Sequence, residues 1–548
     1  MKTLAALCAL ALTACATTPI AKAPETMLDL KITNGRILDG TGAPWFRGDV
    51  GVRGDTIVAL GNLRHLDAKR TIDAQDRIVS PGFIDLLGQS QGTIFHDPAL
   101  EAKVRQGVTT EVTGEGHSPG PVAGPPTERR PWSTLGEYLD LIDKQGVAVN
   151  FAFFVGASNA RELVIGDTNR QPTADELHRM EEIIDQAMRE GAIGISTSLI
   201  YVPAMYSTTE EIIALARVAA KHGGMYFTHM RDEGDRIDMG LDEAFRIGRE
   251  APIPLNIWHL KVGGKANWGR MPHVVGRIEA ERAKGLDVAA NVYPYPASGT
   301  GLSTLAPDWA MEGGYDEFRK RLADPEQREK IRETLKAQIA KRAPKGIFVS
   351  YIFNREMAQY EKKYMEEIAQ LMGVSEDEAL IRLFSGNETS PRVIFFSMHE
   401  DDVQYALKQP WVSAGADSGA APPAARASNQ ASHPRGYGTF PRIVGHYVRD
   451  LKLFTLEEAV RKLTSQAALR VGFHDRGILR EGMKADLIVF DPATIADKSW
   501  FDDPHHFSVG VSDVVVNGVP VLQNGTMTGA LPGKTIRGKG YTGKGAKR

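Results

Sequence analysis

Two histidines and one aspartate each end a different apolar segment of this chain. His229 ends GMYFTH, His259 ends PLNIWH, and Asp417 ends WVSAGAD. Neutral imidazole nitrogens are common zinc ligands, and a carboxylate beside a metal-activated water can act as a general base. A lone histidine is more often a hydrogen-bonded core residue. Three such side chains at the ends of separate strands instead favour a metal-dependent hydrolytic site.

A third protein ligand is needed, because catalytic zinc is usually held by three protein ligands and a water. The segment GVTTEVTGEGHS offers Glu111, Glu115 and His117. Glu111 alternates with the apolar residues of a strand, so a polar neighbour would explain it equally well. Glu115 stands between two glycines, where the backbone can bend towards a metal. We predict Glu115 as the third ligand and His117 as the second choice; the alternative for Glu115 is to position another ligand.

A further set of polar residues has the chemistry to hold a carboxylate. Lys261 lies two residues after His259, Tyr293 and Ser298 lie in NVYPYPASGTG, and Arg435 lies in SHPRGYGTFPR. A guanidinium binds a carboxylate through two hydrogen bonds, whereas an ammonium acts as a point charge. Any one of these side chains alone is more often structural. Together they predict a substrate-binding set, provided that the fold brings them to one place.

The fold expected to position these residues is an α/β barrel. Between residues 81 and 479, apolar strand segments from FIDLLG to PWVSAGADSG alternate with amphipathic helices. One helix, in STTEEIIALARVAAKHG, has a Ser-Thr-Thr-Glu start and stops at Gly223. About eight such units predict a (β/α)8 barrel, in which the active site lies at the C-terminal ends of the strands. Residues 306–390 break the alternation and predict a helical insertion.

Both ends of the chain have the pattern of short strands. Residues 27–80 alternate apolar and polar positions around Asn-Gly, Asp-Gly and Arg-Gly-Asp turns, and residues 480–548 continue in the same style. We therefore expect one small β-sandwich built from both termini. The chain has 548 residues, of which 42% are hydrophobic and 24% charged, as in ordinary soluble globular proteins. A formal net charge of −3 gives no reason to expect a nucleic-acid partner.

The first residues have the pattern of an export signal. Lys2 precedes an apolar run that is too short to span a bilayer, and the run ends in Leu-Thr-Ala-Cys at Cys15. We predict that residues 1–26 are a lipoprotein signal and tether with lipid on Cys15, facing the periplasm. The alternative is an ordinary signal cleaved near Ala23. Both cysteines lie in this segment, which excludes disulfides and thiolate metal ligands from the remainder.

Beyond these features, a series of motifs resembles one enzyme family. In order, PGFID, GVTTEVTG, FTHMRDEGD, WHLK, YPYPASGTGL, GADSG and HPRGYGTFPRIVGHYVRD are similar to segments of the N-acyl-D-amino-acid deacylases, or D-aminoacylases, of the amidohydrolase superfamily. The resemblance runs from about residue 28 to residue 540. It implies the barrel, the sandwich and the insertion, and zinc-dependent hydrolysis of an N-acyl amide to a carboxylate and a D-amino acid.

The resemblance also implies roles for individual residues. His229 and His259 match the two tightly metal-binding histidines of the family, and Asp417 matches its catalytic base. Four residues match the positions that hold the α-carboxylate of the substrate: Lys261, Tyr293, Ser298 and Arg435.

The chain departs from the family at two places. The His-x-His that follows PGFID in the family is replaced by Leu87 and Gln89, and the metal-binding cysteine falls nearest Gly116. In the family the His-x-His pair serves a weaker second metal, so its loss predicts one zinc ion per chain. Two other functions remain open: hydrolysis of D-residue dipeptides, cyclic amides or lactones, and a non-catalytic binding lipoprotein. A small-molecule substrate is expected, and the oligomeric state is left open.

Overall fold

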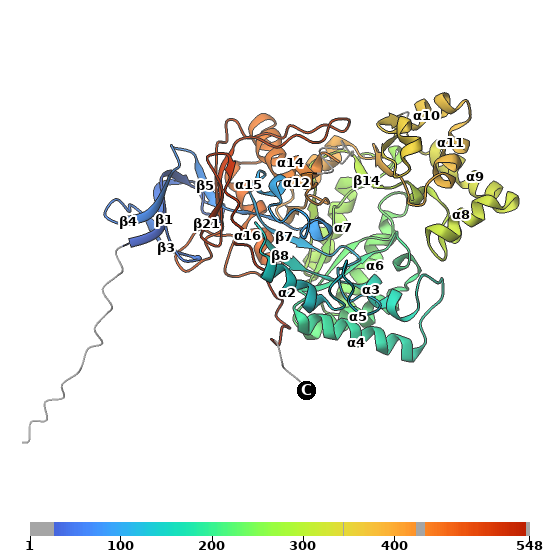
Figure 1. The fold of residues 1–548 in the computed structure, drawn as a ribbon, viewed down its shortest axis with the longest axis horizontal. Helices are drawn as coiled ribbons and strands as arrows, with labels where there is room; N and C mark the ends of the chain where they lie inside the picture. The colour runs from blue at the N-terminus through green and yellow to red at the C-terminus, as the bar shows by residue number, and fades with distance from the viewer. Residues whose placement is uncertain (1–26, 343–344, 424–432, 544–548) are drawn as a thin grey trace, which may run out of the picture.

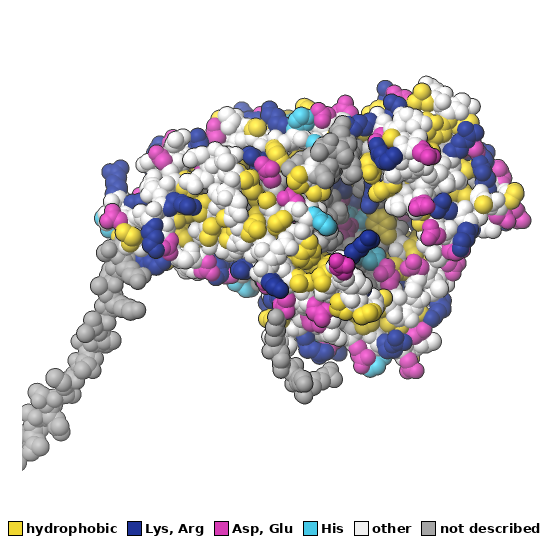
Figure 2. Space-filling model, viewed as in Figure 1, with side chains coloured by type: hydrophobic (Ala, Val, Ile, Leu, Met, Phe, Trp, Pro, Cys, Tyr) yellow, Lys and Arg dark blue, Asp and Glu magenta, His cyan; other side chains and the backbone are white. Residues whose placement is uncertain are grey.

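The computed structural model describes residues 27–342, 345–423 and 433–543 (Figure 1). A sheet made from both ends of the chain lies on one side of a barrel, and an inserted segment, residues 298–395, lies on the other side (Figure 1). The face shown in Figure 2 is hollowed between the inserted segment and the barrel. The predicted signal segment and its Cys15 lie outside the described residues. Within the described part of the chain, no helix is both long and apolar enough to cross a membrane.

The barrel consists of parallel strands in two sheets that close on each other. The first sheet has the order β6-β7-β8 and the second has the order β9-β10-β11-β12-β13-β18. Asp417 N donates to Leu87 O at 2.7 Å, and Ile193 N donates to Phe153 O at 2.9 Å, which joins the sheets at both edges. The strands are β6 (Phe83–Asp85), β7 (Val108–Thr113), β8 (Asn150–Phe153), β9 (Val155–Gly156), β10 (Gly194–Ser198), β11 (Met225–His229), β12 (Leu255–Ile257), β13 (Val288–Val292) and β18 (Val412–Ala414). Strands β8 and β9 are separated by a single residue, Phe154, and together make one unit, so the barrel has eight units and the predicted (β/α)8 barrel is confirmed.

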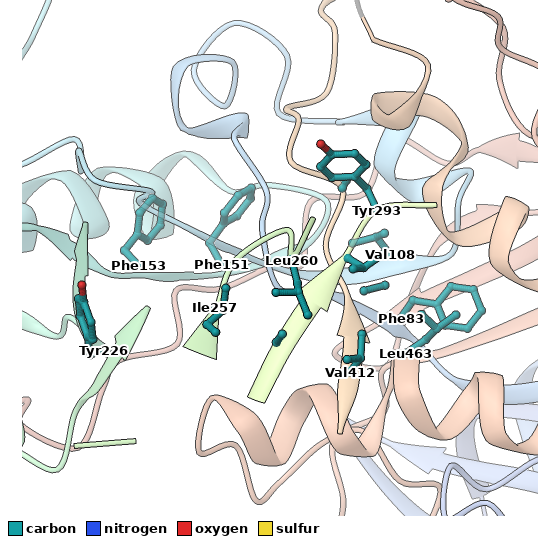
Figure 3. Packing of buried hydrophobic residues seen from close by; sticks show 14 of the residues in the cluster. Phe83, Val108, Phe151, Phe153, Tyr226, Ile257, Leu260, Tyr293, Val412 and Leu463 are labelled. Atoms are coloured by element: carbon teal, nitrogen blue, oxygen red, sulfur yellow. The ribbon is translucent and has the colours of Figure 1, made fainter. Parts of the chain in front are cut away.

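The barrel strands are buried on both faces, which explains their nearly continuous apolar runs. Phe83, Val108, Ile257 and Val412 are all almost completely buried, and Figure 3 shows them packed between strands and helices. Close packing of this kind leaves little room for movement at the strand ends. Side chains placed there are therefore held on a rigid frame.

The helices cover the outside of the barrel, and the helix with a predicted start begins where its sequence indicates. Thr208 caps the helix predicted to stop at Gly223, and the helix runs to Lys221, with Gly223 at a φ of +67°. These helices are α1 (Glu101–Val104), α2 (Leu135–Gln145), α3 (Ala157–Val164), α4 (Ala174–Glu190), α5 (Thr209–Lys221), α6 (Ile237–Glu250), α7 (Met271–Ala283), α12 (Glu400–Lys408), α14 (Arg435–Arg442), α15 (Leu456–Leu463) and α16 (Ser465–Arg470). The π-helix Ile443–Asp450 continues directly from α14.

Strands from both ends of the chain form one folded sheet with the order β22-β21-β20-β19-β5-β1-β2-β3. The first part of β1 pairs with β4 and its last residues pair with β5, so the sheet turns over a small apolar core that includes Ile32 and Val489. The strands are β1 (Met27–Ile37), β2 (Phe46–Arg53), β3 (Thr56–Gly61), β4 (Asp67–Asp73), β5 (Ile78–Pro81), β19 (Leu487–Phe490), β20 (Val511–Val516), β21 (Val519–Gln523) and β22 (Thr526–Met527).

The C-terminal segment leaves this sheet and runs along the barrel. Gly533 N donates to Val147 O at 2.7 Å, and Ile536 N donates to Phe151 O at 2.7 Å, beside β8. Backbone hydrogen bonds of this kind satisfy groups that a barrel wall would otherwise leave to water. The segment therefore fastens the sheet to the barrel.

The inserted segment has its own apolar core and lies over the strand ends. It leaves the barrel after β13 through β14 and returns through β17, and these two strands pair antiparallel. Besides the predicted helices it contains strands: β14 (Ser298–Gly301), β15 (Ile347–Tyr351), β16 (Lys363–Tyr364) and β17 (Arg392–Phe395), with helices α8 (Tyr315–Ala323), α9 (Pro325–Ala340), α10 (Met365–Met372) and α11 (Glu376–Ser385).

Candidate active site

A cavity of about 670 Å³ opens at the C-terminal ends of the barrel strands, beneath the inserted segment. Glu115, His229, His259 and Asp417 all line it. His229 is the last residue of β11, and the other three residues follow β7, β12 and β18, so all four lie at the strand ends where barrel active sites are built. The fold thus brings together residues that lie far apart in the sequence.

Glu115 lies between the two histidines. Its Oε1 is 2.9 Å from His229 Nδ1 and 3.0 Å from His259 Nε2. One donor atom from each of these three residues lies within 4.8 Å of the other two, a spacing compatible with binding of a single metal ion. All three side chains are nearly buried, so few waters compete for the donors. Two nitrogens and one carboxylate oxygen are a suitable ligand set for catalytic zinc.

Two glycines set the position of Glu115. Gly114 and Gly116 have φ angles of +104° and +67°, which favour glycine. A Cβ atom on Gly116 would lie 2.6 Å from Ser198 Cβ, and one on Gly114 would lie 2.7 Å from Phe154 O. A cysteine at residue 116 would therefore require both a backbone change and movement of Ser198. The carboxylate of Glu115 reaches the histidines from the preceding position instead.

His259 and Asp417 both have backbone conformations that strands do not allow. Strand β12 ends at Ile257 and β18 ends at Ala414, and the two site residues follow with φ angles of 36° and 49°. Non-glycine residues in this region are uncommon and concentrate at functional sites. The predicted strand ends were therefore two to three residues too long, because the chain turns into the cavity at these positions.

Glu233 is a site residue that the sequence reasoning missed. Its Oε2 lies 3.2 Å from His229 Nε2, and its Oε1 lies 3.1 Å from His259 Nδ1. Each imidazole therefore has one nitrogen towards Glu115 and the other towards Glu233. A carboxylate behind a ligating histidine fixes the orientation and tautomer of the ring. The only sequence signal is its place four residues after His229, in FTHMRDEGD.

The charges around the histidines favour a cation. Burial opposes ionisation of Glu115, but hydrogen bonds with His229 and His259 outweigh it and hold its pKa well below the ordinary value. Burial and Lys261 lower the pKa of His259, yet Glu233 and other nearby carboxylates outweigh them and raise that pKa to about 9. A position that attracts a proton this strongly also suits a metal ion. The residues present therefore fit a bound zinc.

The structure places the other two candidates, Glu111 in strand β7 and His117 in the loop after it, away from the two histidines. His117 Nε2 lies 2.5 Å from Glu162 Oε1, and its side chain is 43% exposed. Glu111 is buried elsewhere: its carboxylate accepts hydrogen bonds from Ser90 and lies 3.6 Å from Lys103 Nζ. Glu115 is thus the member of this loop that contacts both histidines.

Asp417 has a different partner for each of its oxygens. Gln89 Nε2 donates to Oδ1 at 2.9 Å, and Arg435 Nη1 lies 2.7 Å from Oδ2. Burial is the main cause that raises the pKa of Asp417, and it outweighs the opposing effect of Arg435. A raised pKa makes this carboxylate a better proton acceptor near neutral pH.

Three of the predicted substrate-binding residues line the same cavity: Lys261, Tyr293 and Ser298. Arg435 is buried and contacts two residues that line it, Asp417 and Tyr293. Lys261 Nζ is 2.7 Å from Glu233 Oε2, so the ammonium already has an acidic partner. The guanidinium of Arg435 lies 4.5 Å above the ring of Tyr293. The Tyr293 hydroxyl is buried and has no hydrogen-bond partner among the described residues. Burial raises its pKa well above the ordinary value, so it stays a neutral donor, and Ser298 lines the cavity beside it.

Comparisons with known proteins agree with this architecture. Residues 402–522 match the family model described as an amidohydrolase family. The D-aminoacylase of Alcaligenes xylosoxydans xylosoxydans is 36% identical, over 93% of this chain and 97% of that protein. A solved D-aminoacylase structure has a TM-score of 0.79 at 36% identity, and the match covers 93% of this chain and 100% of that one. That structure addresses the binuclear metal center of D-aminoacylase, with activation by one metal and attenuation by a second.

A second solved structure is the N-acyl-D-glutamate deacylase from Bordetella bronchiseptica, in complex with zinc and a phosphonate inhibitor that mimics the tetrahedral intermediate. It has a TM-score of 0.79 at 32% identity and covers 93% of this chain and all of that one. Barrel, sheet and site together define an amidohydrolase. Within that class, the chain belongs to the family of D-aminoacylases, the N-acyl-D-amino-acid deacylases, as the sequence motifs predicted. At the positions where the resemblance implied a His-x-His pair, this chain has Leu87 and Gln89.

Proposed function

We propose that this protein is a zinc-dependent hydrolase that cleaves N-acyl-D-amino acids to a carboxylate and a D-amino acid. The observation that carries the proposal is the convergence of Glu115, His229 and His259, with Asp417 beside them, in one cavity at the barrel mouth. Full-length similarity to a D-aminoacylase and to two deacylases for N-acylated acidic D-amino acids supports the same reaction. One zinc ion per chain is expected, held by these three residues.

A zinc ion bound there would act as a Lewis acid and lower the pKa of a coordinated water to about 7. Asp417 takes a proton from the attacking water while the water oxygen bonds to the amide carbon. The same carboxyl group then returns the proton to the amide nitrogen as the carbon–nitrogen bond breaks. The Tyr293 hydroxyl, which has no hydrogen-bond partner among the described residues, is a neutral donor that lines the cavity and can hydrogen-bond a substrate oxygen.

Arg435 and Lys261 supply positive charge for the α-carboxylate of the substrate, with Tyr293 and Ser298 beside them. In the free protein Arg435 contacts Asp417. A substrate carboxylate would take over this guanidinium and leave one oxygen of Asp417 free for proton transfer. The fixed positions of base, metal ligands and carboxylate group would select one enantiomer.

The proposed reaction is tested with paired N-acetyl-D- and N-acetyl-L-amino acids, together with a D-dipeptide, a hydantoin and a lactone. We expect zinc-dependent release of acetate from the D-enantiomers, with kcat/KM at least about 100-fold above that of the L-enantiomers, equal to about 2.7 kcal/mol. Preference for the cyclic substrates or the dipeptide would assign the site to a different hydrolytic reaction. Zinc binding without any hydrolysis would favour a binding protein.

Replacing Arg435 with alanine is expected to affect carboxylate-bearing substrates selectively. We predict that kcat/KM for an N-acetyl-D-amino acid falls by about 100-fold or more, because a buried charge-assisted contact is lost. Hydrolysis of the corresponding uncharged N-acetyl-D-amino-acid amide should fall less, by about tenfold at most, because Arg435 also contacts the base Asp417. Arg449→Ala, at a half-buried arginine that pairs with Asp450, serves as the control. Equal losses on both substrates would show that Arg435 does not recognise the carboxylate.

The inserted segment also contributes positive charge to the cavity. Arg342 and Arg392 of the inserted segment line it, and neither has a carboxylate partner among the described residues. Burial lowers the pKa of Arg342 to about 10, and its Nε has no hydrogen-bond partner there. Two cationic groups of this kind favour an anionic substrate side chain.

We therefore predict that N-acetyl-D-glutamate is a better substrate than N-acetyl-D-leucine, and that Arg342→Met reduces this preference about tenfold. The physical reason is the loss of a charge-assisted contact to the side-chain carboxylate. The measurement is the ratio of kcat/KM for the two substrates, with Arg328→Met of the neighbouring helix as the control because Arg328 pairs with Glu378. An unchanged ratio in Arg342→Met would remove this residue from side-chain recognition.

We also propose that the protein is exported and attached to a membrane through lipid on Cys15, facing the periplasm. This location is supported by Lys2, by the apolar run and by the Leu-Thr-Ala-Cys sequence that ends it. Cell fractionation of the full chain and its Cys15→Ala variant tests it. The variant should leave the membrane fraction; equal distribution of both proteins would contradict the attachment.

A further inference from the structure

Gln89 occupies the space between the proposed metal ligand and the proposed base. Its Nε2 donates to Glu115 Oε2 at 2.9 Å and to Asp417 Oδ1 at 2.9 Å. An amide nitrogen has two hydrogens, so each carboxylate receives one of them. The amide oxygen would repel both carboxylates, which fixes the orientation of the side chain. The two carboxylates are thereby joined by one neutral group.

The backbone holds this bridge in place. Gln89 lies in the loop after β6, and its N–H donates to Ser418 O at 3.3 Å, while Gly88 N donates to Val112 O at 2.8 Å. The loop is therefore tied on one side to the residue after Asp417 and on the other to β7, the strand that precedes Glu115. A side chain on such a support is well placed to fix the distance between two others.

This arrangement leaves no place for a second metal ion beside the first. A space bounded by oxygens of Glu115 and Asp417 would suit a cation, but the N–H groups of Gln89 fill it and point towards those oxygens. Leu87, two residues earlier, is fully buried, packs in an apolar cluster and offers no ligand atom. A cation here would meet N–H donors on one side and hydrocarbon on another.

We infer that Gln89 is a positioning residue that takes the place of a second cation, joining Glu115 to Asp417 by hydrogen bonds. It engages Oε2 of Glu115, so that Oε1 alone faces the two imidazoles and would be the oxygen available to hold a zinc ion. It also holds Oδ1 of Asp417. The base therefore keeps one orientation when Arg435 leaves Oδ2 for the substrate carboxylate and Oδ2 becomes free for proton transfer. The role of Asp417 in this inference rests on the proposed function.

The test replaces Gln89 with methionine, which has similar length and volume but no N–H donors. Gln91→Met is the matched control: Gln91 lies in the same loop, accepts a hydrogen bond from Thr113 and lies outside the centre. Zinc affinity is measured by competition with a chromogenic chelator, and kcat and KM are measured at saturating zinc. Thermal unfolding of both variants shows whether the fold is kept.

We expect Gln89→Met to bind zinc about 10- to 100-fold more weakly and to lose about 10- to 100-fold in kcat, with KM changed less than about threefold. Gln91→Met should match the wild type. Zinc affinity within twofold of the wild type would overturn the link to Glu115, and kcat within twofold would overturn the link to Asp417.

A second measurement uses the wild-type protein and does not depend on its catalytic activity. Equilibrium dialysis of the wild-type protein against increasing zinc should saturate at one ion at this centre. A second zinc ion bound at the centre, located by anomalous scattering, would overturn the inference even if Gln89→Met fails to fold. An inactive wild type would instead refute the proposed function, and the zinc affinities of the two variants would still test the bridge.

Discussion

Asp417→Asn is expected to lower kcat by about 1000-fold or more while the protein keeps its zinc. Asparagine preserves the size of the side chain and can still contact Gln89, but it cannot accept the proton of the attacking water. General base catalysis typically contributes 10²- to 10⁴-fold, and here the same group must also protonate the leaving amine. The measurement is kcat for an N-acetyl-D-amino acid, with zinc per chain determined on the same sample.

The control for this variant is Asp401→Asn, at an aspartate whose side chain is 83% exposed and lies outside the cavity. It should retain wild-type kcat. Substantial turnover by Asp417→Asn with its full zinc content would assign the proton transfer to another residue. Loss of zinc in that variant would instead show that Asp417 binds the metal.

Glu115→Ala is expected to lose nearly all bound zinc and, with it, nearly all activity. The variant removes one of three protein ligands and leaves two imidazoles, which hold zinc weakly. It also leaves a donor of Gln89 without its acceptor. After dialysis against a weak chelator, we expect less than about one tenth of the wild-type zinc per chain, because metal affinity depends on the complete ligand set.

His117→Ala is the informative partner of this experiment, because His117 was the other candidate for the third ligand and contacts Glu162 instead. It should retain zinc and activity close to the wild-type values. The reverse pattern, with zinc kept in Glu115→Ala and lost in His117→Ala, would place the metal on the other side of the loop. Undiminished zinc in both variants would mean that neither residue is a ligand.

The sequence predicted the barrel because its signals are local and strong. Strands buried on both faces give short apolar runs, and capped helices give clear starts, as with Thr208. The site residues at the strand ends could be predicted because the parallel strands of a barrel bring their C-terminal ends together at one face. The turn around Glu115 could also be predicted, because its two positive φ angles favour glycine and the sequence has glycine at both positions.

The side chains that contact these site residues could not be predicted from the sequence. Glu233 lies in the loop after β11, only four residues from His229, whereas Gln89 lies in the loop after β6, 328 residues from Asp417; both reach the site through the conformation of a loop. Neither residue lies at a position that periodicity singles out. The absence of His-x-His suggested a lost metal site, but only the structure shows that an amide takes up the space between two carboxylates.

Two features of the fold were also hidden, for different reasons. Strands β15 and β16 lie in a charged, helix-rich segment, and β15 pairs with β17, which lies at the end of the insertion and pairs in turn with β14 at its start. The segment around Gly533 and Ile536 runs along the barrel through backbone hydrogen bonds, which leave little trace in side-chain pattern. Non-local pairing of this kind is the part of a fold that sequence periodicity does not encode.

The central claim is that one zinc ion is bound by Glu115, His229 and His259 at the mouth of the barrel. The most direct test is an anomalous difference map at the zinc edge from crystals of the zinc-loaded protein. We predict one peak, about 2.0–2.2 Å from a nitrogen of each histidine and from one oxygen of Glu115. No peak at this position, or a peak coordinated by a different set of residues, would contradict the account.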